Sequence, residues 1–220
     1  MDRLYGGFVR RSDLVFDIGA HVGDRVASLR RLGARVVAVE PQPAMVRVLK
    51  LLHSGADVAI EAVAIGGGIG TTSIMINADN PTVSTASPAF ISAARDAAGW
   101  ETQRWNSSIE VPVTTLDVLI AKHGAPVFIK IDVEGFEAEA LRGLSRAVKA
   151  LSFEFTTIQR DVALACIERC VALGYARFNA ALGESQTFVN ADWVDSEEIA
   201  RWLTGLPHAA NSGDIYAALA

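Results

Sequence analysis

Short apolar segments alternate along the chain with segments in which apolar residues recur every three or four positions. This alternation of strand and helix patterns predicts a mostly parallel sheet with helices on both faces. The expected strands are 14–17, 35–41, 57–66, 71–77, 108–116, 127–132, 151–155, 175–180 and 185–194. The first expected helix ends at Gly33, and the second carries Met45, Val48, Leu49 and Leu52 on its inner face. Three more helices are expected over 116–123, 137–148 and 161–173, and a last helix is expected to begin with Ser196 as its N-cap.

The segment 78–107 departs from this rhythm. It is rich in Ala, Ser, Thr and Asn, and it contains Phe90, Trp100 and Trp105. Long connections of this kind in compact domains are usually functional. We expect a lid or substrate segment here, whose aromatic side chains cover a ligand or pack the segment down. The chain of 220 residues, 50% of them hydrophobic, is otherwise expected to form one domain over 1–220.

Composition narrows the range of partners. The net charge of -5 and the isoelectric point near 5.4 give no broad basic field, which disfavours nucleic acid as a partner. No apolar stretch approaches the roughly 20 residues that span a bilayer, and no signal peptide is evident. A cytoplasmic protein without a membrane partner is therefore expected. Cys166 and Cys170 lie four residues apart in an expected helix and are interpreted as small core residues.

A glycine turn follows the first expected strand in the stretch "DIGAHVG". Gly19 and Gly23 allow close backbone approach to a ligand, while the turn lacks the G-x-G-x-x-G spacing of dinucleotide sites. Asp17 ends the first strand and favours a cationic group over a polyphosphate, and Glu40 ends the second strand, where an acid can accept ribose hydroxyls. His21 is expected to contact the ligand through its backbone. The alternative is that Asp17 caps a helix and Glu40 is merely solvated.

A second charged group interrupts an otherwise apolar strand in "FIKIDVEGFE", residues 128–137. Alternation places Lys130 and Asp132 on one face, so Lys130 is expected to be half buried and to need a carboxylate partner. Asp132 and Glu154 are the candidates. A purely structural ion pair remains the alternative to a catalytic group. If this strand neighbours the first one at the switch point of the sheet, Asp132 and Glu134 lie beside the same ligand.

Five stretches, taken in order, resemble the FkbM family of S-adenosylmethionine-dependent methyltransferases: "DIGAHVGD", "VVAVEPQP", "EAVAIG", "VTTLD" and "IKIDVEGFEAEALRGL". The similarity runs over about 14–155. The resemblance implies a single class I methyltransferase domain, Rossmann-like, with a mostly parallel seven-stranded sheet. It implies O-methylation of a hydroxyl on a sugar, glycan or polyketide-like metabolite. The cofactor residues implied are Asp17, Gly19, Ala20, Gly23, Glu40, Glu61 and Ala62. His21 and Pro41 are further candidates for cofactor binding. The family commonly has Asn at position 21.

Methyl transfer from a sulfonium needs an aligned nucleophile and, in some cases, a base for its proton. We take as catalytic candidates Asp132, as base or orienting group, Lys130, which tunes it, and Glu134, which positions a ligand. No metal is expected; Mg²⁺ held by Asp132, Glu134 and Glu137 is less favoured because Glu137 suits a helix start. The rival functions are a non-catalytic S-adenosylmethionine-binding partner protein and, with less support, a nucleotide-dependent oxidoreductase. The sequence is also compatible with a homodimer.

Overall fold

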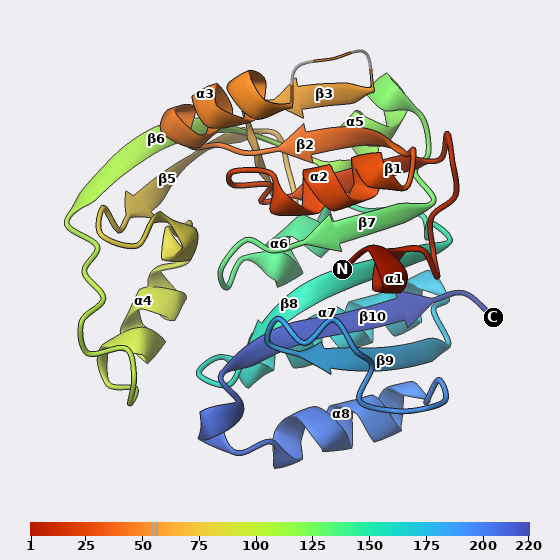
Figure 1. Cartoon of the computed structure of the whole chain (residues 1–220). Coiled ribbons are helices and arrows are strands. Elements are labelled where there is room, and N and C mark those ends of the chain that lie inside the picture. The colour runs from red at the N-terminus through yellow and green to blue at the C-terminus, as the bar shows by residue number, and fades with distance from the viewer. Residues whose placement is uncertain (54, 56) are drawn as a thin grey trace.

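The computed structural model describes residues 1–53, 55 and 57–220 (Figure 1). Within them the strands are β1 (Leu14–Ile18), β2 (Arg35–Val39), β3 (Val58–Glu61), β4 (Ala64–Ile65), β5 (Gly70–Ile76), β6 (Ser107–Thr114), β7 (Phe128–Ile131), β8 (Ala150–Thr156), β9 (Arg177–Leu182) and β10 (Ser212–Ala218). The α-helices are α1 (Asp2–Tyr5), α2 (Asp24–Arg31), α3 (Pro43–Leu52), α4 (Pro88–Arg95), α5 (Leu116–His123), α6 (Glu137–Arg142), α7 (Arg160–Leu173) and α8 (Ser196–Gly205).

The central layer is a seven-stranded sheet in the order β3-β2-β1-β7-β8-β10-β9. Its strands pair in parallel except where β10 pairs antiparallel with β8 and β9. The sequence prediction of a mostly parallel seven-stranded α/β sheet is confirmed. From β1 the chain moves outward through β2 and β3, and it later returns to place β7 on the other side of β1. The switch point therefore lies between β1 and β7, where ligands bind in doubly wound sheets.

Helices cover both faces of this sheet. One face packs against α1, α2 and α3 through residues such as Val26, Leu29 and Leu49. The other face packs against α5, α6, α7 and α8. Strand β7 shows the alternation directly, because Phe128 lies in the first core while Ile129 and Ile131 lie in the second. Lys130 consequently shares the α2 face, and it is more deeply buried than predicted, with 2% of its surface exposed.

A smaller sheet of order β4-β6-β5 lies outside the central layer. Figure 1 shows that β5 and α4 stand beyond the carboxyl ends of the central strands. The three aromatic residues of the segment 78–107 form a small core of their own, in which Phe90 contacts Trp100 and Trp105 edge to face. Of the two interpretations of these aromatic side chains, the structure supports packing of the segment.

Several expected elements differ from the observed ones. Residues 185–194 form no strand; the last strand is β10, which follows α8 and lies between β8 and β9. The single strand expected over 57–66 is divided into β3 and β4, which belong to different sheets. Helix α6 ends at Arg142, short of the expected 148, because the chain turns at Gly143. Leu52 lies outside the core, with 58% of its surface exposed.

The N-cap of α8 is Asp195 rather than Ser196, because the Asp195 side chain accepts a hydrogen bond from the Glu198 N–H. Cys166 and Cys170 are free and fully buried, which confirms their interpretation as core residues. Within the described part of the chain, every helix is too short or too polar to cross a bilayer.

Candidate functional site

A cavity of about 360 Å³ opens at the carboxyl ends of β1, β2 and β7. This volume lies in the range of roughly 300–1,000 Å³ that small-molecule sites occupy. Thr82, Ser84 and Ala86 of the segment 78–107 form part of the wall. Thr85 fixes that segment to the turn after β7 by donating a hydrogen bond of 2.6 Å to the Glu134 carbonyl. The segment therefore closes one side of the cavity.

The glycine turn after β1 lines the cavity, but its glycines are required by contacts within the protein. Gly19 has a φ of +82°, and a Cβ there would lie 1.7 Å from the Asp132 carbonyl oxygen. Gly23 has a φ of +93°, and a Cβ there would lie 2.4 Å from His53 Nε2. Both positions demand glycine, because an added methyl group collides with backbone or ring atoms. Both glycines also line the cavity, so the close approach of a ligand to their backbone stays a prediction.

Glu40 lines the cavity and is held by the backbone. Its carboxylate accepts hydrogen bonds from the His21 N–H at 3.0 Å and from the Gln42 N–H at 2.8 Å. Only 3% of Glu40 is exposed, and burial raises its pKa to about 6. His21 has a φ of +47°, the left-handed geometry that directs its N–H to this carboxylate. The backbone of His21 therefore positions Glu40.

The remaining predicted cofactor residues divide into two groups. Ala20 and Pro41 lie in the cavity wall. The Glu61 carboxylate lies outside the wall and binds Lys122 Nζ at 2.6 Å and His123 Nε2 at 2.7 Å. Ala62 also lies outside, and the wall beside it is formed by Val63 and Ala64. The residues that follow β3, rather than the end of β3 itself, therefore line the cavity.

Asp17 lies beneath the cavity rather than in its wall. It is fully buried, and neither carboxylate oxygen has a hydrogen-bond partner among the described residues. Its Cα pairs with that of Lys130 across the β1–β7 register, so the two side chains share one face of the sheet. Burial raises the pKa of Asp17 to about 6, although Lys130 and Arg25 oppose this shift. Asp17 therefore acts on the site through its charge.

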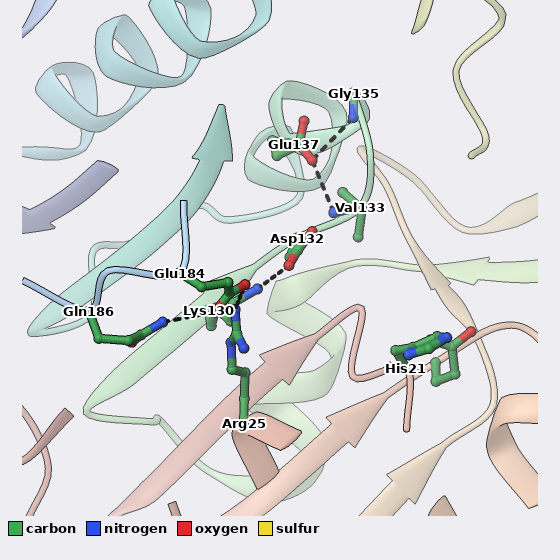
Figure 2. A network of polar contacts seen from close by, with 10 residues as sticks. His21, Arg25, Lys130, Asp132, Val133, Gly135, Glu137, Glu184 and Gln186 are labelled. Carbon is green, nitrogen blue, oxygen red and sulfur yellow. Dashed lines mark hydrogen bonds and ion pairs between the residues drawn. The ribbon is translucent and has the colours of Figure 1, made fainter. Parts of the chain in front are cut away.

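Lys130 pairs with Asp132, one of its two predicted partners (Figure 2). Burial disfavours the ammonium, but the carboxylates of Asp132 and Asp214 raise the pKa of Lys130 above its ordinary value. Burial also favours neutral Asp132, yet the adjacent ammonium holds the pKa of Asp132 below its ordinary value. The pair is ionised, and Asp132 keeps 27% of its side chain exposed to the cavity.

Three carboxyl groups meet beside this ammonium. One oxygen each of Asp132, Glu134 and Glu154 lies within 4.8 Å of the others, and all three residues line the cavity. Burial and the negative charge of Asp132 raise the pKa of Glu134 and of Glu154 well above the ordinary value. The cluster therefore offers an ionised carboxylate next to carboxyl groups that hold a proton readily.

Glu137 is the first residue of α6 and supports the turn after β7 (Figure 2). Its carboxylate accepts hydrogen bonds from the Val133 N–H at 3.0 Å and the Gly135 N–H at 3.2 Å. These bonds hold Glu134 at a φ of +55°. The less favoured magnesium group of the sequence analysis contained Glu137, whereas the observed carboxyl cluster contains Glu154. Glu154 was considered there only as a partner for Lys130, because the sequence gives no distance between β7 and β8.

Sequence reasoning missed Arg25 and Glu184 in the cavity wall. Arg25 Nη2 lies 2.7 Å from Glu184 Oε1, and Gln186 donates to the other oxygen of Glu184 at 3.1 Å (Figure 2). His21 lies apart from this group in the same view. The two paired residues are 159 positions apart. No local pattern in the sequence joins them.

The sequence model of the "Methyltransferase FkbM domain" family matches residues 17–208. The chain belongs to the FkbM methyltransferase family. This confirms the resemblance seen in the sequence and makes the protein a member of a methyltransferase family. The cavity of this FkbM protein lies at the carboxyl ends of β1 and β7, beside the switch point at which the sequence analysis expected a ligand.

The FkbM chain is similar to solved methyltransferase structures, one of which matches its fold with a TM-score above 0.5. A methyltransferase FkbM from Methylobacillus flagellatus KT matches with a TM-score of 0.57 and 16% identity, over 96% of this chain and 45% of that one. A precorrin-6y C5,15-methyltransferase from Geobacter metallireducens GS-15 matches with a TM-score of 0.46 and 13% identity, over 99% and 86% of the two chains. The FkbM chain thus spans less than half of the Methylobacillus protein. None of the curated proteins compared with it matches in sequence.

Replacing Asp17 with Asn is expected to raise the free energy of unfolding at pH 8 by about 1–3 kcal/mol. The folded-state pKa of about 6 lies above the unfolded value of 3.8. The wild type therefore loses stability as the pH rises from about 4 to 6, and the variant lacks this loss. Urea unfolding between pH 4 and pH 8 measures the difference.

The gain from Asp17→Asn should shrink towards zero as the pH falls to about 4. Asp192→Asn, at an exposed position in the loop after β9, is the matched control. A gain that is equal across the pH range, or a loss of stability at pH 8, contradicts the assignment of Asp17 as a buried and uncompensated acid.

Proposed function

We propose that this protein transfers the methyl group of S-adenosylmethionine to a hydroxyl oxygen of a small metabolite or glycan. The observation that carries the proposal is one cavity that both Glu40 and the carboxyl cluster of Asp132, Glu134 and Glu154 line. Membership of a methyltransferase family supports the reaction class.

The residues present fit this cofactor. Each oxygen of Glu40 accepts one backbone N–H and retains a lone pair for a ribose hydroxyl. The carboxyl cluster and the buried Asp17 provide negative potential for a sulfonium cation. Glu40 and the carboxyl cluster line the same cavity as the turn at 17–23. This turn lacks the glycine spacing of dinucleotide sites. These features favour an adenosyl sulfonium over a nicotinamide dinucleotide.

The bound cofactor supplies an electrophilic methyl group on sulfur. The protein then has to align the acceptor oxygen with that group and take up the hydroxyl proton. We assign Asp132 to orienting the hydroxyl, because pairing with Lys130 keeps it ionised and makes it a weak base. The proton passes to the ionised form of Glu134 or Glu154, because burial and the negative charge of Asp132 raise the pKa of both groups and so strengthen them as bases.

Glu40→Gln is expected to weaken binding of S-adenosylhomocysteine by about 10- to 100-fold, the loss of hydrogen bonds to a charged acceptor. Calorimetry measures this, with NAD titrated in parallel and expected not to bind. Glu61→Gln is the matched control, because Glu61 lies outside the cavity wall and pairs with Lys122. Binding of NAD in preference to S-adenosylhomocysteine would instead identify an oxidoreductase.

Asp132→Asn is expected to lower methyl transfer by about 10²-fold or more while S-adenosylhomocysteine binding changes by less than about threefold. Transfer is measured with labelled methyl donor against a panel of sugars and other hydroxylated metabolites. Glu168→Gln, at an exposed position on α7, is the control. Turnover that survives Asp132→Asn unchanged removes Asp132 from the mechanism. Binding without transfer to any acceptor supports the non-catalytic partner protein.

A further inference from the structure

The ion pair between Arg25 and Glu184 joins α2 to the loop that follows β9, and both residues line the cavity. Arg25 is the second residue of α2 and reaches towards Lys130 in Figure 2. Its side chain is largely shielded, with 18% exposed, whereas 72% of the Glu184 side chain is exposed. The Arg25 guanidinium is therefore held in the cavity wall, while most of the Glu184 side chain is exposed to solvent.

Two positively charged side chains, Arg25 and Lys130, belong to the described part of the cavity wall. Lys130 is buried to 2% exposure and paired with Asp132, whose loss would leave a buried charge without compensation. The Arg25 pair has an exposed partner, and pairs of this kind contribute only about 0–1 kcal/mol. A ligand in the cavity can therefore displace Glu184 from Arg25 far more cheaply than it can separate Lys130 from Asp132.

The surroundings of Arg25 favour an anion. Gly23, the N-cap of α2, has no side-chain cap, so the N–H groups of the first turn add positive potential, which Asp24 in the same turn reduces. A guanidinium donates two parallel hydrogen bonds to a carboxylate, which gives a defined orientation as well as charge pairing. Asp132 of the carboxyl cluster is near enough for Arg25 to lower its pKa, but this carboxylate is already paired with Lys130. A carboxylate entering this cavity is therefore directed to Arg25.

We propose that Arg25 binds a carboxylate of a ligand in this cavity and that Glu184 occupies this place in the ligand-free protein. Two sources supply such a group: the amino-acid end of the adenosyl cofactor, or an acidic group of the methyl acceptor. The first source rests on the proposed function. The carboxylate displaces Glu184, whose exposed side chain then turns to solvent.

Calorimetry with S-adenosylhomocysteine and 5′-methylthioadenosine tests the cofactor as the source, because the second compound lacks the amino-acid end. Arg25→Met should weaken S-adenosylhomocysteine binding by about 10- to 100-fold, the range for a charge-assisted hydrogen-bonded pair, and leave methylthioadenosine binding unchanged within about twofold. Glu184→Gln should tighten S-adenosylhomocysteine binding a few-fold, because the competing counterion is removed. A merely structural pair gives no such tightening.

Arg142→Met is the matched control, since Arg142 forms an exposed pair with Glu139 on α6 at 2.7 Å. Thermal unfolding of each variant shows that the fold is retained. The acceptor is tested as the source by titrating glucuronate and its neutral counterpart glucose into protein saturated with S-adenosylhomocysteine. The carboxylate belongs to the acceptor if the wild type binds glucuronate but not glucose, and if Arg25→Met loses glucuronate binding while it still binds S-adenosylhomocysteine.

The inference is overturned if Arg25→Met changes neither S-adenosylhomocysteine nor glucuronate binding, or if it weakens S-adenosylhomocysteine and methylthioadenosine equally. Failure of the wild type to bind either adenosyl compound counts against the proposed function instead. In that case glucuronate binding to wild type and to Arg25→Met still decides whether Arg25 takes a carboxylate.

Discussion

The arrangement of acidic residues at the site depends on a lysine ammonium that is buried in the middle of the central sheet. Lys130 has 2% of its surface exposed and pairs with Asp132 at the end of β7. An ammonium in this position is stable only if carboxylates surround it, and Asp17 and Asp214 add to the effect of Asp132 on its pKa. The charge of Lys130 thereby offsets part of the cost of burying Asp17 on β1, Asp132 after β7 and Asp214 on β10.

The topology of the sheet places this charged group beside the cavity. Parallel pairing of β1 with β7 brings the glycine turn next to the end of β7, where the Gly19 backbone meets the Asp132 carbonyl. The same edge carries Glu40 on one side and Glu154 on the other. A ligand in the cavity spans these positions. The family of the chain supplies the reaction class, and the proposals on cofactor, acceptor and Arg25 follow from the charges in the wall.

The sequence predicted the central sheet because each strand and helix of the repeated unit has its own local pattern. Helices α5 and α7 were predicted within one residue of their observed bounds for this reason. The closing strand was misplaced because 185–194 contains Phe188 and Trp193, typical of strands, which here pack as a loop against Phe8 and Tyr216. Packing of this kind depends on distant residues and leaves no local periodicity.

The site was predicted as far as motif order and strand ends define it. Glu40, Lys130, Asp132 and Glu134 meet the cavity, while Glu61 turns to Lys122 because a single residue along a strand reverses the direction of the side chain. Glu154, Arg25 and Glu184 come from other elements, so only the folded chain shows that they belong to the site.

A crystal structure with S-adenosylhomocysteine bound tests the site most directly. The ribose hydroxyls should lie within hydrogen-bond distance of Glu40, with the sulfur turned towards Asp132 and the carboxyl cluster. A ligand found elsewhere, or an empty cavity at saturating ligand with Lys130 and its carboxylates unchanged, would show that the buried charge serves only the fold.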